Sequence, residues 1–414
     1  MRVATLVLCC VVIAGCSSGG GLPAMRSGAA NPGLPQSSQP AYSGYAVLYS
    51  FKGHASGGEP AGNLTVYKSM LYGTTSSYGK GFGTVFAASP FGKPRVLHEF
   101  GGFPDGAYPQ AGLVVLDGTF YGTTSAGGSH GGGTVFSISP AGAEKVIHSF
   151  GKLHDGAQPE GRLYVNNGVL YGTTQNGGAH GRGVVFEVTP SGQELILHDF
   201  AGAPGDGGHP SGGLILVKGN FYGTTRAGGK LASGGAVFRL SPFGRERVIH
   251  SFGIDPGDGK NPAGTLLVHN DVLFGTTLHG GSFGKGGTVF EMTTGGSEIV
   301  LHSFGQGSDG AFPSAGLVAV NNEFYGTTLG GGDSPRQTKD CISSGDVRVP
   351  GYYRCGTIFK INQFGQERVV YRFKGDPDGA NPEDTLTDVG GVLYGTTLWG
   401  GTATYYGTIF RILP

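Results

Sequence analysis

The hydrophobic residues of this chain occur in short runs separated by Gly, Asp, Asn and Pro, from residue 45 onward. One set of four runs reads AGLVVLDG (111–118), TFYGTTSAGG (119–128), GTVFSISPAG (133–142) and KVIHSFG (145–151). Runs rich in β-branched and aromatic residues with such boundaries are typical of β-strands. Because no interval has a sustained helical period, the pattern predicts an all-β protein.

Four such runs form a unit that occurs seven times, which indicates a repeat architecture. The most regular part is the tetrapeptide YGTT (FGTT once), and its copies start 49, 50, 51, 52, 51 and 69 residues apart. The copies start at Tyr72, Tyr121, Tyr171, Tyr222, Phe274, Tyr325 and Tyr394. Pairs such as Asp117-Gly118 and Asn167-Gly168 suit the tight turns that join antiparallel strands. Each unit is therefore expected to be a four-stranded antiparallel sheet.

Seven such sheets could stack as a β-solenoid or close as a β-propeller. Residues 45–53 (YAVLYSFKG) match the fourth run of the unit, whereas 407–414 (GTIFRILP) match the third. The first strand can therefore complete the last sheet, which closes a ring and leaves only short edges. We predict a seven-bladed β-propeller over 45–414, closed by pairing of 45–53 with 407–414. The side chains that this closure should bury are Val47, Tyr49 and Phe51.

The phrase YGTT…GG…GTVF…P.G…LHSF…DG..P resembles the GloVer tandem repeat of bacterial surface proteins, over essentially all of 45–414. The resemblance implies a cell-surface location and a repeat fold, and it implies no particular activity. This chain departs from the pattern at Phe274, in the long sixth copy, and at GGEP (57–60), where the Asp is lost.

The first residues have the features of a secretory signal. Arg2 precedes a short apolar run, Val3 to Ala14, which is too short to span a bilayer. Ile13-Ala14-Gly15-Cys16 resembles the lipobox of bacterial lipoproteins, which implies removal of residues 1–15 and acylation of Cys16. The alternative is an ordinary signal peptide with a nearby cysteine.

Ser17 follows this cysteine, and the absence of Asp there favours the outer membrane. Residues 16–44 are rich in Ser, Gly and Pro and are expected to be a flexible tether. We therefore expect a lipid-anchored protein of the bacterial outer membrane or cell surface.

Charge narrows the range of partners. Lys and Arg total 28 and Asp and Glu total 28, so the formal net charge is zero. This balance gives no broad electrostatic basis for binding nucleic acid. We expect a monomeric propeller with a polysaccharide or protein partner.

Cysteine usage agrees with export. After loss of the signal and acylation of Cys16, only Cys341 and Cys355 remain. An oxidising compartment favours a disulfide between them, which would close the insertion of the sixth copy (333–354).

Motifs that suggest catalysis have simpler explanations. Gly127 to Gly131 (GGSHG) matches G-x-S-x-G, but Ser129 lies between two predicted hairpin strands, and a nucleophile elbow needs a helix after the serine. One position of the fourth strand carries a histidine in five copies: His98, His148, His198, His250 and His302. Metal binding would require several imidazoles to converge, whereas blades hold equivalent positions apart, so we interpret these histidines as packed rings.

The Asp of D-G-x-x-P recurs in six copies, at Asp105, Asp155, Asp206, Asp258, Asp309 and Asp378. These carboxylates could be calcium or acid–base groups, or they could cap backbone N–H groups in Asx turns. Six similar environments favour the turn, because an acid–base pair needs two unlike environments. We therefore expect no catalytic residue, metal or cofactor.

Residues that break the sevenfold pattern are the best candidates for a binding site. Loops from second to third strands and from fourth to first strands should lie on one face, which includes the sixth-copy insertion and the seventh-copy loop (398–406). Exposed aromatic and Arg side chains are typical of sugar and protein binding. The predicted ligand-binding residues are Trp399, Tyr405, Tyr406, Tyr352, Tyr353, Arg336 and Arg354. Alternatively, Trp399 packs beneath the insertion.

Two functions remain open. The first is a non-enzymatic surface propeller that binds a polysaccharide or protein on this loop face. The second is a carbohydrate-active hydrolase or lyase that uses acids on the same face.

Overall fold

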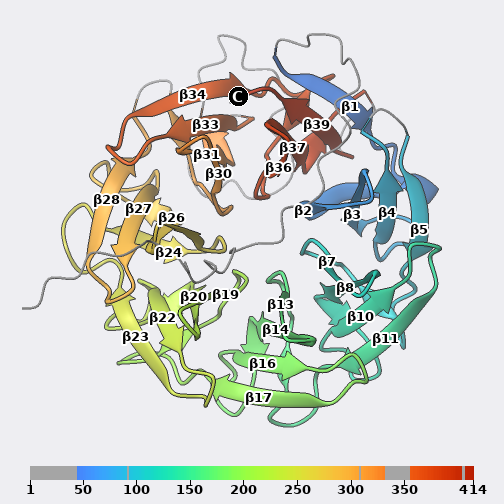
Figure 1. The fold of residues 1–414 in the computed structure, drawn as a ribbon, viewed down its shortest axis with the longest axis horizontal. Helices are drawn as coiled ribbons and strands as arrows, with labels where there is room; N and C mark the ends of the chain where they lie inside the picture. The colour runs from blue at the N-terminus through green and yellow to red at the C-terminus, as the bar shows by residue number, and fades with distance from the viewer. Residues whose placement is uncertain (1–43, 91–92, 307–308, 332–354, 403–405) are drawn as a thin grey trace, which may run out of the picture. The chain divides into compact units, whose positions relative to one another are not determined.

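The computed structural model describes residues 44–90, 93–306, 309–331, 355–402 and 406–414. All of them belong to one compact unit, 33–414. Seven antiparallel sheets, the blades, are arranged in a ring around a central axis (Figure 1). The predicted seven-bladed β-propeller is therefore confirmed. The helical structure among the described residues is a short 3-10 turn, η1 (His54–Ser56), and no helix in this part of the chain could cross a membrane.

The four main strands of each blade are numbered from the axis outward. Blade 1 comprises β2 (Gly58–Tyr67), β3 (Met70–Ser77), β4 (Thr84–Ala88) and β5 (Arg95–Glu99). Blade 2 comprises β7 (Val114–Leu116), β8 (Thr119–Thr124), β10 (Thr134–Ile138) and β11 (Glu144–Ser149). Blade 3 comprises β13 (Tyr164–Asn166), β14 (Val169–Thr174), β16 (Val184–Val188) and β17 (Glu194–Asp199). Blade 4 comprises β19 (Ile215–Val217), β20 (Asn220–Thr225), β22 (Ala236–Leu240) and β23 (Glu246–Ser251).

The remaining blades follow the same order. Blade 5 comprises β25 (Leu267–His269), β26 (Val272–Gly280), β27 (Thr288–Thr293) and β28 (Glu298–Ser303). Blade 6 comprises β30 (Val318–Val320), β31 (Glu323–Thr328), β33 (Thr357–Ile361) and β34 (Glu367–Arg372). Blade 7 comprises β36 (Thr387–Val389), β37 (Val392–Thr397), β39 (Thr408–Ile412) and, from the other end of the chain, β1 (Ala46–Ser50).

Short ladders join the two kinds of long loop at five blades, and in blade 1 the same pairing, Gly58 with Ser77, is part of β2 and β3. They pair β6 (Gly106–Ala107) with β9 (Ala126–Gly127), β12 (Gly156–Ala157) with β15 (Asn176–Gly177), and β18 (Gly207–Gly208) with β21 (Ala227–Gly228). They also pair β29 (Gly310–Ala311) with β32 (Gly330–Gly331), and β35 (Gly379–Ala380) with β38 (Trp399–Gly400). In blade 5, β24 (Gly259–Pro262) pairs with the long β26 instead.

The ring closes as the sequence predicts, through β1 and β39. Ala46 pairs with Arg411 and Ser50 with Thr408. Phe51 is 0% exposed, but Val47 and Tyr49 are only half-buried, which corrects the prediction for these two residues. Val47 and Tyr49 remain partly exposed because β1 is the outermost strand of blade 7. Of the three residues only Phe51, which follows the end of β1, enters the core between blades.

Aromatic pairs hold neighbouring blades together. The Phe after the fourth strand of one blade meets the Phe of the GTVF-type strand of the next, with ring centroids 4.9–5.4 Å apart at all seven junctions. The pairs are Phe51–Phe86, Phe100–Phe136, Phe150–Phe186, Phe200–Phe238, Phe252–Phe290, Phe304–Phe359 and Phe373–Phe410. All of these rings are buried, and edge-to-face contacts add about 0.5–1.5 kcal/mol each beyond burial.

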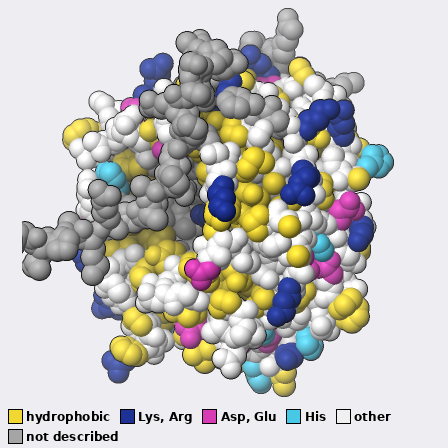
Figure 2. Space-filling view, turned by 45° about the vertical axis from the view of Figure 1, so that its right-hand side comes forward, with side chains coloured by type: hydrophobic (Ala, Val, Ile, Leu, Met, Phe, Trp, Pro, Cys, Tyr) yellow, Lys and Arg dark blue, Asp and Glu magenta, His cyan; other side chains and the backbone are white. Residues whose placement is uncertain are grey.

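Charged side chains are dispersed over the surface. Figure 2 shows basic and acidic groups intermingled with hydrophobic atoms, without a broad patch of one sign in this view. This distribution agrees with the zero formal net charge.

Candidate functional site

The long loops lie on one face of the ring, as predicted. Each short ladder joins a loop that enters the blade to the loop between its second and third strands, as in the pairing of Gly106 with Gly127. We call this the loop face. The opposite face carries the tight turns, such as the one at Asp117-Gly118.

Most of the predicted ligand-binding residues fall outside the described residues: Arg336, Tyr352, Tyr353, Arg354 and Tyr405. Trp399 is half-buried and packs against the core cluster that contains Phe373 and Ala380. Tyr406 is also half-buried, and its ring meets that of Tyr78 edge to face at 4.9 Å. Both therefore have packing contacts, and their role in binding stays a prediction.

Two predicted modifications involve cysteines that the structure does not describe. Cys16 and Cys341 lie outside the described residues, so acylation and the Cys341–Cys355 disulfide stay predictions. Cys355 is 2% exposed, within the core cluster of blades 6 and 7.

The G-x-S-x-G match is part of a turn. Ser129 lies between β9 and β10, and its backbone N–H donates to Ser149 Oγ at 3.2 Å. No helix follows it, so the strand-to-helix geometry of a nucleophile elbow is absent here.

The recurring aspartates cap backbone turns, as favoured from the sequence. Asp105 accepts hydrogen bonds from the N–H groups of Gly101 (2.8 Å) and Gly106 (2.7 Å), and its Oδ2 lies 3.1 Å from His98 Nε2. Burial raises the pKa of Asp105, but the bonds from His98 and the glycines outweigh burial and lower it overall. The His98 ring also packs edge to face on Phe100, at 4.9 Å.

A pocket of about 360 Å³ lies on the axis, toward the loop face. Two kinds of segment line it: the residues after the Pro of D-G-x-x-P, where the first strands begin, and the residue after YGTT, where the second strands end. Its neutral polar lining comprises Asn63, Gln110, Ser211, Thr265, Ser314 and Thr385, and its charged lining comprises Glu160, Arg162, Arg226, Glu383 and Asp384.

Arg226 and Glu383 are the charged side chains of this pocket for which the described residues provide no hydrogen bond. The Nε of Arg226 is buried and has no hydrogen-bond partner among the described residues. The Glu383 side chain is solvent-accessible within the pocket but is surrounded by protein. Burial, followed by repulsion from Asp384, raises the pKa of Glu383 to about 7, against the opposing attraction of Arg226.

The other charged side chains of the pocket form hydrogen bonds within the protein. Glu160 accepts a hydrogen bond from Gln175 Nε2 at 2.8 Å, and burial raises its pKa although Arg226 opposes this. Arg162 donates to the carbonyl oxygen of Leu113 from Nε (3.2 Å) and Nη2 (2.9 Å). Burial lowers the pKa of Arg162 to about 10, so it remains charged at neutral pH.

Asp384 links the first and last blades near the axis. Its Oδ1 accepts from the N–H of Gly62 in blade 1 (2.7 Å), and its Oδ2 accepts from Thr396 Oγ1 in blade 7 (2.9 Å). Burial raises the pKa of Asp384 to about 6, and these two hydrogen bonds oppose the rise. Both carboxylate oxygens are thus used within the fold.

Sequence reasoning missed this pocket, although the copies contain a signal for it. The residue after the recurring Pro is acidic only in copies three and seven, at Glu160 and Glu383. The residue after YGTT is Arg only in copy four, at Arg226. These departures lie in different copies, and only ring closure brings them together on the axis.

Seven blades around a polar axial pocket define the protein as a β-propeller built from tandem repeats. The chain belongs to the Gloeobacter/Verrucomicrobia repeat family, whose profile matches residues 24–173 and 145–338. The family resemblance seen in the sequence is therefore confirmed. Comparison with curated proteins finds no match.

Several solved structures resemble the fold distantly. The computationally designed protein Ika8 is 13% identical with a TM-score of 0.47, and the match covers 89% of this chain and 99% of that one. A gluconolactonase from Xanthomonas campestris is 12% identical with a TM-score of 0.43, covering 91% and 99%. A putative gluconolactonase is 12% identical with a TM-score of 0.42, covering 90% and 93%. Similarity this low carries no functional argument.

Proposed function

We propose that the protein is a non-enzymatic binding module of the bacterial cell surface, anchored by lipid, whose axial pocket binds an acidic carbohydrate. The observation that carries this proposal is Arg226, a guanidinium in the pocket with a buried N–H that has no partner among the described residues.

An unpaired buried donor costs about 1–3 kcal/mol, so the Arg226 guanidinium is not fully satisfied within the fold. The Nε is shielded from solvent, so a ligand in the pocket would contact the accessible part of this half-buried side chain. A carboxylate is the best match for a guanidinium, because it can accept two parallel N–H bonds. Arg226 therefore favours a ligand with an acidic group.

The rest of the lining favours a sugar over an apolar ligand. Six neutral polar residues from different blades line the pocket, whereas its larger apolar residues are Leu278 and Leu329. The hydroxyls of Ser211, Thr265 and Thr385 also bond to the backbone of neighbouring blades. Hydroxyl and amide groups arranged around a ring suit the many hydroxyls of a carbohydrate. The volume of about 360 Å³ lies within the usual range for small-ligand sites.

The second candidate, a carbohydrate-active hydrolase or lyase, is favoured by the raised pKa of Glu383, which would suit a general acid. Glycoside hydrolysis ordinarily needs a second working carboxyl group. Asp384 is adjacent, but its two oxygens accept hydrogen bonds from Gly62 and Thr396. Glu160, the other carboxyl group of the pocket, accepts a hydrogen bond from Gln175. The geometry therefore supports binding better than catalysis.

Calorimetric titration of the purified mature chain tests the proposal, with oligogalacturonate as the acidic probe and a neutral galactoside of equal length as its control. We expect the acidic probe to bind and the neutral one to bind far more weakly. Arg226→Gln should weaken binding at least about tenfold, which corresponds to about 1.4 kcal/mol. Arg247→Gln, on the outer strand β23 of the same blade, is the matched control and should bind as the wild type does.

Equal affinity of Arg226→Gln and wild type would contradict the proposal, as would failure to bind acidic glycans of any linkage. Shortening of the probe during incubation, abolished by Glu383→Gln, would establish the enzymatic alternative instead.

A further inference from the structure

Five blade junctions hold the same set of three side chains, which come from two neighbouring blades. Each set has a His from the fourth strand of one blade, the Asp of the connecting loop, and the Glu that begins the fourth strand of the next blade. The sets are His98, Asp105 and Glu144; His148, Asp155 and Glu194; His198, Asp206 and Glu246; His250, Asp258 and Glu298; and His302, Asp309 and Glu367. Within each set, one nitrogen and two carboxylate oxygens lie within 4.8 Å of one another.

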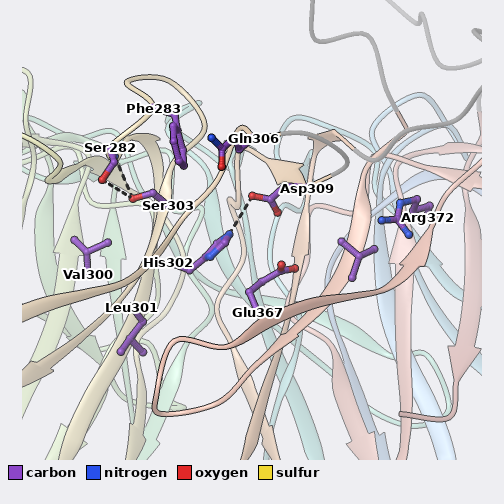
Figure 3. Close-up of a pocket in the computed structure, with 11 residues that line it drawn as sticks. Ser282, Phe283, Val300, Leu301, His302, Ser303, Gln306, Asp309, Glu367 and Arg372 are labelled. Atoms are coloured by element: carbon purple, nitrogen blue, oxygen red, sulfur yellow. Dashed lines mark hydrogen bonds and ion pairs between the residues drawn. The ribbon is translucent and has the colours of Figure 1, made fainter.

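Figure 3 shows the set between blades 5 and 6. His302 and Asp309 point toward each other, with Nε2 3.0 Å from Oδ2, and Glu367 extends toward them from β34. The set lies in a groove of about 690 Å³, which also contains Ser303 and Phe283. Solvent can therefore reach this set from the rim of the ring.

At two junctions the three atoms converge without satisfying one another. His148 Nε2, Asp155 Oδ2 and Glu194 Oε1 are all buried and have no hydrogen-bond partner in the part of the chain that the structure describes. The same holds for the equivalent atoms of His250, Asp258 and Glu298. The aspartates are deeply enclosed, with side chains 9% and 6% exposed, respectively. Orphaned buried polar atoms are rare in folded proteins and require an explanation.

At these two junctions the distances suit a bound cation better than direct hydrogen bonds, whereas at the other three the His Nε2 lies 3.0–3.3 Å from an oxygen of the Asp. His148 Nε2 is 3.4 Å from Asp155 Oδ2 and His250 Nε2 is 3.9 Å from Asp258 Oδ1, both long for an N–H···O bond. Ligand atoms at 2.0–2.2 Å from a tetrahedral Zn²⁺ are about 3.4 Å apart. Two carboxylates facing each other also leave excess negative charge, which a divalent cation would neutralise.

We propose that each of these five junctions is a binding site for a divalent transition-metal cation of the Zn²⁺ type. The ligands are His Nε2 and one oxygen each of Asp and Glu, and solvent completes the coordination. Because the ligands come from two blades, each cation would link neighbouring blades near the rim. This role is independent of the axial pocket.

The two remaining junctions support the assignment, because the His and the Glu are replaced together. Between blades 6 and 7, Tyr371 and Tyr45 occupy the two positions, and their rings stack at 3.8 Å. Between blades 7 and 1 all three positions differ: the His is replaced by Tyr49, the Asp by Ser56 and the Glu by Pro94. No junction retains the His without the Glu, as expected if both bind one ion. The proposal thus predicts five sites rather than seven.

The test is metal stoichiometry of the full mature chain, stripped with EDTA, loaded with ZnCl₂ and desalted before elemental analysis. We expect about five zinc ions per chain. Glu194→Gln and Glu298→Gln should each lower the count by about one, and together by about two. Glu187→Gln, on strand β16 of blade 3 and outside all five sets, is the matched control and should leave the count unchanged.

A second measurement reports on geometry and on the link between blades. Co²⁺ in place of Zn²⁺ should give the intense visible absorption of low-symmetry four-coordinate cobalt, reduced in proportion in the two Glu→Gln variants. Zinc should also raise the melting temperature, because an ion that binds only the folded state stabilises it.

Retention of fewer than about four zinc ions by the wild type would overturn the proposal of five sites without any variant. An unchanged count in the double variant would also overturn it, because the zinc would then be bound elsewhere. If the double variant fails to fold, the stoichiometry and cobalt spectrum of the wild type decide the matter.

Discussion

At the residue scale, the recurring YGTT motif reflects two close contacts. An added Cβ at Gly122 would lie 2.7 Å from the tip of the Phe136 ring, so only glycine lets that ring reach its place between blades. In five copies the second Thr also meets a Thr of the next strand, as in Thr124 and Thr134, whose hydroxyls are 2.8 Å apart. The motif is therefore explained by packing, which agrees with its presence in every copy.

Gly223→Ala is expected to destabilise the propeller. The new methyl would lie 2.6 Å from Phe238 Cζ, and that buried ring cannot move away because it packs against Phe200. Overpacking of this kind costs about 1–3 kcal/mol, measurable by urea unfolding. Gly295→Ala is the matched control, because its nearest contact would be an ordinary 3.7 Å and its φ is not positive. Equal stability of the two variants would contradict the packing explanation.

Asp384 gives a prediction for pH. Its pKa is about 6 in the folded state and 3.8 as a free side chain. Between these values the folded state binds the proton more tightly, so the contribution of Asp384 to stability falls as pH rises from about 4 to 6, then stays constant. The free energy of unfolding of the wild type should therefore fall relative to Asp384→Asn over this window, by about 1–3 kcal/mol.

Denaturant unfolding at several pH values measures this difference. Asp388→Asn, an exposed aspartate of the same blade, is the control and should follow the wild-type profile. Parallel profiles for wild type and Asp384→Asn would show that burial does not perturb Asp384.

At the element scale, β1 is expected to matter more than a strand near a chain end usually does. It supplies the outer strand of blade 7 and places Phe51 against Phe86 of blade 1. A chain that starts at residue 55 should melt at a markedly lower temperature or aggregate, because the edge of β39 and a core contact are then exposed. A chain that starts at residue 43 should melt like the full mature chain. Equal melting of both chains would argue against ring closure by β1.

The sequence was sufficient to predict the strands, their order and the ring, because these follow from local patterns repeated in seven copies. It was not sufficient for contacts between copies. Glu144 meets His98, which lies 46 positions earlier and in another blade, and no local pattern links them. Similarly, the axial pocket joins Arg226 to Glu383 only after the chain has passed around the ring. The closing strand shows the same limit, since its pairing was predictable but the partial exposure of Tyr49 was not.

At the scale of the whole molecule, the ring separates two kinds of site. The His-Asp-Glu sets repeat with the blades and lie near the rim, so they serve the junctions between repeats. Each charged position of the axial pocket is charged in only one or two of the seven copies, so these residues make one site per ring. A repeat protein can therefore hold a unique ligand site on its axis while its outer positions stay regular.

The last prediction concerns attachment of this ring to the membrane. If Cys16 is acylated, the wild type should partition into the detergent phase and carry the mass of its acyl chains, because several chains on one residue give stable anchoring. Cys16→Ser should instead leave an unprocessed or aqueous protein, while Cys10→Ser, a change within the signal, should be acylated normally. The melting temperature of the propeller should be the same in all three, because residues 16–44 are expected to form a tether separate from the folded ring. Wild-type protein recovered in the aqueous phase without acyl groups would exclude the lipid anchor and leave secretion as the alternative.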